Sequence, residues 1–316
     1  MNTGFYLFPP SASAAAGRYD ALFLALVLLT GFAALAVTLL IVYFSIRYRK
    51  GSRADRSHAP ATGRRIEIIW TAVPLLLFLA IFAWAAYDYT WLYRAPPDAM
   101  PVFVVAKQWM WKLEHANGRR EIDELHVPLG QPVRLVMTSQ DVIHSFFVPA
   151  FRIKQDVLPG RYVSIWFTPT RTGEFHLFCA EYCGTDHAGM RGRIVVMRPS
   201  EFSAWLQAGN TQPGMAARGF ELYRRYGCSG CHEPQSSVHA PDLHGLLGRE
   251  VHLADGRTLI ADEAYVRDSV LLPKKDVVAG YAPIMPSFAG QIGEEDLLAI
   301  IEYLRSTGGG NARAGQ

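Results

Sequence analysis

The chain has 316 residues, half of them hydrophobic, and a formal net charge of +3. Half is a high share for a wholly soluble protein, so membrane segments are expected, and the length leaves room for two or three domains. The net charge of +3 indicates little by itself, because residues 47–65 alone contribute more positive charge than that, and no nucleic-acid partner is indicated.

Two uncharged apolar runs near the N-terminus are long enough to cross a membrane as helices. They cover residues 21–46 and 68–87, and the second lies between Glu67 and Asp88. About 20 apolar residues span a hydrocarbon layer as an α-helix. A buried helical hairpin is the alternative, but the length of the uncharged runs argues against it. We expect a transmembrane helical hairpin over residues 21–95.

The orientation of this hairpin follows from its basic residues. Residues 1–20 carry only Arg18, whereas the loop region between the spans carries Arg47, Arg49, Lys50, Arg53, Arg56, Arg64 and Arg65. Basic loops stay in the cytoplasm, so residues 47–65 are predicted to be cytoplasmic. Both termini and everything after Asp88 then lie on the periplasmic face of a bacterial inner membrane. Residues 1–17 lack a basic stretch, so we expect the first span to be retained rather than cleaved.

Residues 96–206 are predicted to form an all-β sandwich. Short segments rich in Val, Ile and Phe, with Pro or Gly at several boundaries, are typical of its strands. They cover residues 102–106, 133–138, 162–168, 173–178 and 192–197. A short helix is expected to begin near Pro199, and residues 207–216 read as a linker.

Residues 217–306 are predicted to form a separate all-α domain. Helices are expected at residues 218–226, 263–270 and 294–305. In the last of these, apolar residues recur at helical spacing and predict one buried face; they are Leu297, Leu298, Ile301 and Leu304. The glycine-rich tail, residues 307–316, is expected to be disordered.

The first pair of cysteines, Cys179 and Cys183, is followed closely by His187 and Met190, while His144 lies upstream. Two thiolates four residues apart can bridge two metal ions, and imidazole and thioether ligands complete sites suited to copper. A disulfide between the two cysteines of an exported domain is one alternative, but it would make the spacing of the two histidines and the methionine a coincidence. A mononuclear site is the stronger one, but blue copper uses a single cysteine and structural zinc rarely uses methionine. Two coppers are favoured.

With these motifs in view, residues 21–200 resemble subunit II of haem-copper cytochrome c oxidases, in which two transmembrane helices precede a cupredoxin domain with a binuclear CuA centre. The motif CxExCGxxHxxM matches at every position of residues 179–190. The resemblance implies a set of copper ligands: His144, Cys179, Cys183, His187, Met190 and the backbone carbonyl of Glu181. It also implies that the Glu181 carboxylate faces the catalytic subunit and helps to bind a magnesium or manganese ion there.

The same resemblance implies roles for two further residues, Trp109 and Glu67. The stretch Lys107 to Trp111 matches the family's aromatic segment, in which the position of Trp109 receives electrons near the metal. Ordinary sandwich packing is the alternative for Trp109. Glu67 matches a carboxylate at the entrance of a proton channel in the partner subunit. The alternative for Glu67 is a plain interfacial acid favoured by a helix N-terminus.

The second pair of cysteines lies in a CxxCH motif. Cys228 and Cys231 are predicted to attach one haem c covalently, and His232 to bind its iron from one side. The domain resembles a class I cytochrome c, which favours Met285 as the opposite axial ligand. His239, His244 and His252 are the competing candidates.

Together these features resemble a caa3-type oxidase subunit II with a fused cytochrome c domain. The resemblance implies that electrons pass from an external donor, such as cytochrome c or a cytochrome bc complex, through haem c to CuA. They continue to haem in subunit I, which carries haem and CuB and reduces oxygen coupled to proton translocation; subunit III is a further expected partner. An electron-accepting subunit of a CuA-type nitric oxide reductase and a membrane-anchored copper-delivery or redox-sensing protein remain the alternatives.

The two exported domains carry opposite charge. Counting Lys and Arg against Asp and Glu, residues 101–200 give 12 minus 9, or +3, and residues 217–306 give 9 minus 13, or −4. We expect the haem domain to take the place of a soluble donor at Trp109. Its docking there is expected to be weak, because a flexible linker keeps the haem domain close and the attraction between the oppositely charged domains weakens with salt.

Overall fold

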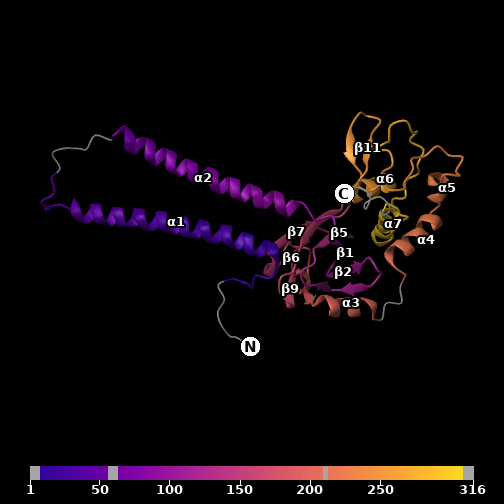
Figure 1. Cartoon of the computed structure of the whole chain (residues 1–316), viewed down its shortest axis with the longest axis horizontal. Coiled ribbons are helices and arrows are strands. Elements are labelled where there is room, and N and C mark those ends of the chain that lie inside the picture. The colour runs from indigo at the N-terminus through magenta and orange to yellow at the C-terminus, as the bar shows by residue number, and fades with distance from the viewer. Residues whose placement is uncertain (1–7, 56–62, 209–212, 309–316) are drawn as a thin grey trace. The chain divides into compact units, whose positions relative to one another are not determined.

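The computed structural model describes residues 8–55, 63–208 and 213–308 (Figure 1). The chain divides into two compact units, Ala14–Arg94 on the one hand and Met1–Ser13 with Ala95–Gln316 on the other. Most of the tail expected to be disordered, from residue 309 onward, lies outside the described residues, as do residues 209–212 of the predicted linker.

The smaller unit is a helical hairpin made of α1 (Ala14–Arg47) and α2 (Arg64–Tyr93). Both helices are long and apolar enough to cross a membrane. They extend beyond the predicted spans, because each continues into its polar flanks. Arg18 of α1 and Asp88 of α2 form an ion pair at 2.9 Å. A charged pair within one hairpin neutralises two side chains that would each be costly near lipid.

The larger unit contains a sandwich of two five-stranded sheets. The first has the order β3-β2-β1-β5-β8 and the second the order β4-β10-β9-β6-β7. The strands of the first sheet are β1 (Met100–Lys107), β2 (Met110–His115), β3 (Arg120–Ile122), β5 (Val133–Ser139) and β8 (Val163–Phe167). Those of the second are β4 (Glu124–Pro128), β6 (His144–Val148), β7 (Ile153–Val157), β9 (Gly173–Cys179) and β10 (Arg191–Met197). The prediction of an all-β sandwich is confirmed.

The strand β1 shows how the alternation of side chains builds this sandwich. Val102 and Val104 are fully buried in the core between the sheets. Phe103 and Val105 point to the opposite face of the same sheet, because successive strand residues alternate. Those two side chains are also buried, but within a second cluster that includes residues of the haem domain.

A short helix, α3 (Pro199–Gln207), follows the sandwich, and the C-terminal domain is mainly helical as predicted. Its helices are α4 (Met215–Arg225), α5 (Ser229–His232), α6 (Glu263–Leu271) and α7 (Glu294–Thr307), with a small hairpin of β11 (Glu250–His252) and β12 (Thr258–Ile260). The apolar face predicted for α7 is buried. Gly219 allows α4 and α7 to cross closely, since a Cβ at this position would lie 1.9 Å from the carbonyl oxygen of Ala299.

Candidate metal centre and haem cavity

The copper-ligand candidates are supplied by the ends of neighbouring strands of the second sheet. His144 is the first residue of β6, and Cys179 is the last residue of β9. The β6–β9 ladder pairs Phe146 with Cys179, and the amide of Ala180 donates to the carbonyl of Ser145 at 3.0 Å. These backbone bonds hold the His144 strand beside the start of the cysteine loop.

The loop after β9 brings the other candidates back to the same place. Cys183 lies within it, His187 begins the short 3-10 helix η2 (His187–Gly189), and Met190 comes directly before β10. The amide of Cys179 donates to the carbonyl of Met190 at 3.2 Å, which closes the loop on itself. The loop therefore returns its last candidate ligand to its first.

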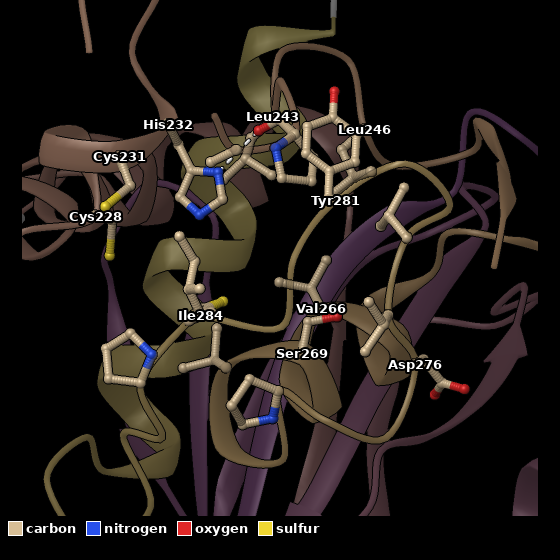
Figure 2. Close-up of a pocket in the computed structure, with 18 of the residues that line it drawn as sticks. Cys228, Cys231, His232, Leu243, Leu246, Val266, Ser269, Asp276, Tyr281 and Ile284 are labelled. Carbon is tan, nitrogen blue, oxygen red and sulfur yellow. Dashed lines mark hydrogen bonds between the residues drawn. The ribbon is translucent and has the colours of Figure 1, made fainter. Parts of the chain in front are cut away.

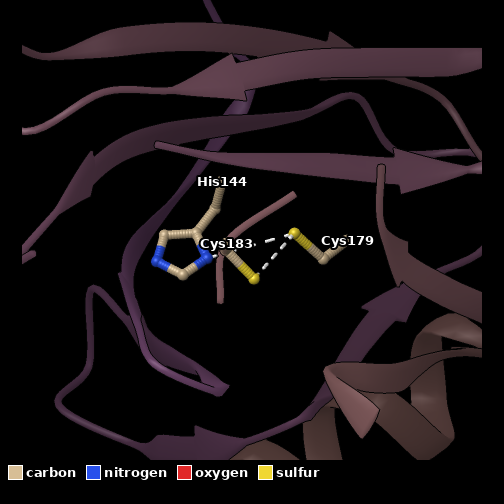
Figure 3. Close-up of side chains that lie close together, drawn as sticks. All are labelled: His144, Cys179 and Cys183. Atoms are coloured by element: carbon tan, nitrogen blue, oxygen red, sulfur yellow. Dashed lines mark hydrogen bonds between the residues drawn. The ribbon is translucent and has the colours of Figure 1, made fainter. Parts of the chain in front are cut away.

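All six predicted ligand residues meet at one place. Five of them contribute a side chain, and Glu181 contributes its backbone carbonyl. The sulfur atoms of Cys179 and Cys183 are 3.7 Å apart. This separation is far beyond the length of a disulfide bond, about 2.05 Å, and all four cysteines of the chain are free. Figure 3 shows the imidazole of His144 directed at the same space as the two sulfur atoms.

The remaining candidates complete a ring of soft and nitrogen donors. Nδ1 of His144 lies 3.1 Å from Sδ of Met190, and Nδ1 of His187 lies 3.5 Å from Sγ of Cys183. The carbonyl oxygen of Glu181 lies 3.2 Å from Sγ of Cys179. Two thiols, two imidazoles, one thioether and one carbonyl are the donor set that suits copper better than harder cations. The residues present fit a thiolate-bridged copper pair.

This site is buried on its inner side and open on its outer side. His144, Cys183 and Met190 are at most 2 % exposed, whereas Tyr182 is 76 % exposed. The side chain of Glu181 is also exposed. A low-dielectric interior and an exposed loop face together suit a redox centre that must exchange electrons with a partner.

Three residues around the ligands fix their positions. Asp141 accepts a hydrogen bond from Nε2 of His144 at 2.9 Å, which leaves Nδ1 facing the sulfur atoms. The carbonyl of Cys183 accepts from Nε2 of Gln108 at 2.8 Å and from Nε1 of Trp109 at 3.2 Å. Sequence reasoning singled out Trp109 but missed Asp141 and Gln108. Asp141 could have been found from the sequence, because a carboxylate three residues before a candidate histidine ligand is close enough to bind its ring.

Gly184 makes the close approach of these side chains to the loop feasible. Its φ is +118°, and a Cβ there would lie 2.8 Å from Nε2 of Gln108. Only glycine adopts this conformation without strain and leaves room for the neighbouring amide. The glycine of the CxExCGxxHxxM motif thus has a role in shaping the loop.

The two thiols differ in acidity in the metal-free chain. Burial alone would raise the pKa of Cys179, but its hydrogen bonds with His144 and with the backbone at Glu181 lower that pKa to about 6. Burial and the neighbouring Cys179 raise the pKa of Cys183 to about 12. Of the two thiols, Cys179 is therefore the one that is ionised at neutral pH. A bound metal cation would favour loss of the second proton, because coordinating thiols ionise.

The haem candidates lie around one large cavity in the C-terminal domain. The cavity has a volume of about 420 Å³ and is lined mainly by apolar side chains, with Cys228, Cys231, His232 and Met285 among them. Figure 2 shows Cys228, Cys231 and His232 grouped on one side of this cavity. Nδ1 of His232 donates to the carbonyl of Pro241 at 2.8 Å, so Nε2 is left for iron. The cavity and its side chains fit a covalently attached haem.

The competing histidines occupy different places. His239 lines the cavity and stacks on Tyr281 with 4.6 Å between the ring centroids. His244 lies against Asp242 and His252 against Thr258, and both sit among exposed side chains. Among the described residues, Met285 and His239 are therefore the two candidates on the cavity wall that could face His232 across a haem.

Glu67 lies in the first turn of α2, in the helical unit, with an exposed side chain. The N-terminal end of a helix favours an acidic side chain at this position.

Three known protein families match successive parts of the chain. The transmembrane domain of cytochrome c oxidase subunit II matches residues 1–86, the periplasmic domain of that subunit matches residues 112–198, and cytochrome c matches residues 216–308. The order of the matches is the order of the hairpin, the sandwich and the haem-cavity domain.

Individual relatives agree with these matches. A cytochrome c oxidase subunit 2 of Thermostichus vulcanus is 30% identical over 253 residues, which are 63% of this chain and 77% of the relative. A cytochrome c oxidase subunit 2 of Alkalihalophilus pseudofirmus is 28% identical over 94% of this chain and 89% of its own length. The crystal structure of the periplasmic domain of subunit II of cytochrome oxidase from Bradyrhizobium japonicum is 31% identical, with a TM-score of 0.35, over 36% of this chain and 95% of that one.

The subunit II matches cover the hairpin and the sandwich, and the cytochrome c match covers the haem cavity, so the arrangement is that of a caa3-type fusion. Such a subunit is part of a haem-copper oxidase, an oxidoreductase complex, and it is anchored in a membrane. The chain belongs to the cytochrome c oxidase subunit II family.

Proposed function

We propose that this chain receives electrons for its oxidase and passes them from a covalent haem c to a binuclear CuA centre. When bound, the two groups would supply one-electron redox chemistry, and the residues of this chain would hold them between an external donor and the haem of subunit I, where oxygen would be reduced. The convergence of Cys179, Cys183, His144, His187 and Met190 on one point carries the proposal. A haem-attachment cavity in the same chain supports it.

In the copper site, each residue has a role that its surroundings support. Cys179 and Cys183 would bridge the two coppers, because their sulfur atoms already lie side by side. His144 and His187 would each bind through Nδ1, with Met190 and the Glu181 carbonyl as weaker ligands. The hydrogen bond to Asp141 would keep His144 rigid. Rigid ligands keep structural change during electron transfer small.

In the haem domain, Cys228 and Cys231 would form the thioether bonds and His232 would bind the iron. We assign the opposite axial position to Met285 rather than His239, because a methionine and histidine pair gives the higher iron potential. A high potential suits a donor that feeds a terminal oxidase.

Three further residues complete the proposal. The exposed side chain of Glu181 is free to reach a magnesium or manganese ion shared with subunit I. Trp109 donates to the Cys183 carbonyl, which supports a role close to the copper in electron transfer. Glu67 would lie near a proton-channel entrance in subunit I. We place the copper and haem domains on the periplasmic side of the bacterial inner membrane, with subunits I and III as neighbours.

The decisive measurement is electron paramagnetic resonance of the full chain after copper loading, together with metal and haem analysis. Two coppers per haem and a signal from one unpaired electron shared by two copper nuclei are expected. One copper per chain, or a signal confined to a single nucleus, would rule out the binuclear site. Assay of the purified complex with oxygen and with nitric oxide then separates an oxidase from a nitric oxide reductase.

A further inference from the structure

The outer face of the sheet β3-β2-β1-β5-β8 has an apolar centre. The ladder between β1 and β5 places Phe103 beside Val136, and Val105 lies two residues further along β1 on the same face. Phe103, Val105 and Val136 are only 1 %, 4 % and 1 % exposed. They are buried in one cluster with residues of the haem domain such as Met215 and Leu298. These side chains would otherwise form an apolar patch on the surface of the sandwich.

Charged side chains around this centre form ion pairs with the haem domain, and the basic partner lies on the sheet in some pairs and on the haem domain in others. On the sheet side, Lys112 contacts Glu295 at 2.8 Å and Arg134 contacts Glu263 at 2.8 Å. With the signs reversed, Glu114 of the sheet contacts Arg218 of α4 at 2.7 Å. A pattern of this kind matches only one orientation of the two surfaces, because any other places like charges together.

Two of the three acidic partners in these pairs are shielded from solvent. The side chains of Glu114 and Glu263 are 10% and 8% exposed. Partly buried ion pairs are screened by salt much less than exposed ones. A further bond joins the guanidinium of Arg267 in α6 to the carbonyl of Gly160 at 2.6 Å, beside Tyr162, which lies in the apolar cluster.

The described ends of the interdomain linker are attached to a single turn of the sandwich. The amide of Met215 donates to the carbonyl of Ala116 at 3.0 Å, and Asn117 donates to the carbonyl of Leu206 at 3.0 Å. Gly118 belongs to the same turn, and a Cβ there would lie 2.4 Å from the carbonyl oxygen of Pro213. The described residues on both sides of positions 209–212 are thus attached to the β2–β3 turn.

We propose that this sheet face is a permanent seat for the cytochrome c domain, which stays bound to the copper domain throughout turnover and does not move on a tether. We define the seat by Phe103, Val105, Val136, Tyr162, Lys112, Glu114 and Arg134. The proposal rests on the proposed function, since it describes how haem c is held for transfer to copper.

The position of the seat differs from the expectation that the haem domain would cover Trp109. Trp109 packs against the core of the sandwich and donates to Cys183, and it is not a member of the seat. The outer sheet face is preferred because it offers a continuous apolar centre with matched charges. The exposed copper loop, with Tyr182, is thereby left for a different partner while the haem domain is seated.

The test is cleavage of the linker in the full, cofactor-loaded chain in detergent, after residues 209–212 are replaced by a protease site. The seat predicts that the haem fragment stays with the copper-containing fragment on gel filtration at about 1 μM protein, at both about 0.1 M and about 0.5 M salt. A haem fragment that separates at the lower salt concentration would overturn the proposal.

A matched pair of variants identifies the surface. Val136→Asp places a charge at the centre of the seat, and Ile122→Asp makes the same change on β3 of the same sheet, where the side chain is 64% exposed. After cleavage, the fraction of released haem domain should rise at least about tenfold for Val136→Asp and stay at the wild-type value for Ile122→Asp. An intact copper spectrum shows that each sandwich is folded. Equal retention in both variants would contradict the seat.

The seat and the proposed function fail in different ways. Retention is read from haem absorbance, whether or not electrons pass. In the cleaved protein, haem-to-copper transfer should remain first order and change less than about twofold between low and high salt. A retained haem domain with no transfer to copper would refute the electron path and leave the seat standing.

Discussion

Glu263 offers the sharpest quantitative prediction, because it is a buried carboxylate that joins two domains. It is 6 % exposed at the start of α6 and lies between Arg134 of the sheet, at 2.8 Å, and Arg305 of α7. Burial alone would raise its pKa, but the ion pairs with Arg134 and Arg305 outweigh burial and lower the pKa from 4.5 to about 2. The ionised form is therefore stabilised by folding.

The magnitude follows from this shift. About 2.5 pKa units at about 1.4 kcal/mol each give about 3 kcal/mol of free energy of unfolding at neutral pH. Because the folded pKa is depressed, this contribution is complete above pH 4.5 and is lost as the pH falls towards 2. Burial and the nearby charge of Glu263 raise the pKa of Glu302, so loss of that charge in Glu263→Gln would reduce the Glu302 shift and offset a small part of the destabilisation.

The assay is thermal unfolding of Glu263→Gln and wild-type full chain, followed by the haem absorbance. At pH 7 the variant should unfold more than about 10 °C lower, because about 1 kcal/mol corresponds to at least about 4 °C in a domain of this size. Near pH 3.5 the difference in free energy should shrink to about 2 kcal/mol. Glu201→Gln, at an exposed pair with Arg198, is the matched control and should leave the midpoint unchanged. Equal differences at the two pH values would refute the reasoning.

Three further predictions test the two redox sites. Cys183→Ala should abolish the shared-electron copper signal and leave the haem spectrum intact, because the sites have no ligand in common; loss of both would contradict separate centres. Asp141→Asn removes the carboxylate that orients His144 and should weaken copper binding about 10- to 100-fold, measured by competition with a chelator. Met285→Ala should lower the haem potential in a redox titration, whereas His239→Ala should not, and the reverse result would make His239 the axial ligand.

The sequence predicted the parts of this molecule whose signals are local. The two apolar runs, the buried face of α7 and the spacing of the cysteine motifs each lie within one short stretch of chain. The all-β and all-α domains followed from composition and turn residues, and the fold confirms them. The ligand set required the family resemblance, because His144 is 35 residues from Cys179 and only the β6–β9 ladder brings them together.

What the sequence did not predict depends on tertiary contacts. Asp141 and Gln108 carry no motif of their own, and their roles appear only when they meet His144 and Cys183. The strand β6 was missed because its five residues include the polar pair His144 and Ser145. The outward-facing residues of β1 looked like ordinary strand residues, and their burial depends on a domain that begins over a hundred residues later.

The ladder between β6 and β9 also governs when a complete metal site can first exist. Until those strands pair, the unfolded chain holds the cysteine loop and His144 as separate segments, and neither segment contains all the candidate ligands. The complete set of ligands therefore forms only when the sandwich closes, and we expect copper to be inserted into the folded domain rather than into the unfolded chain.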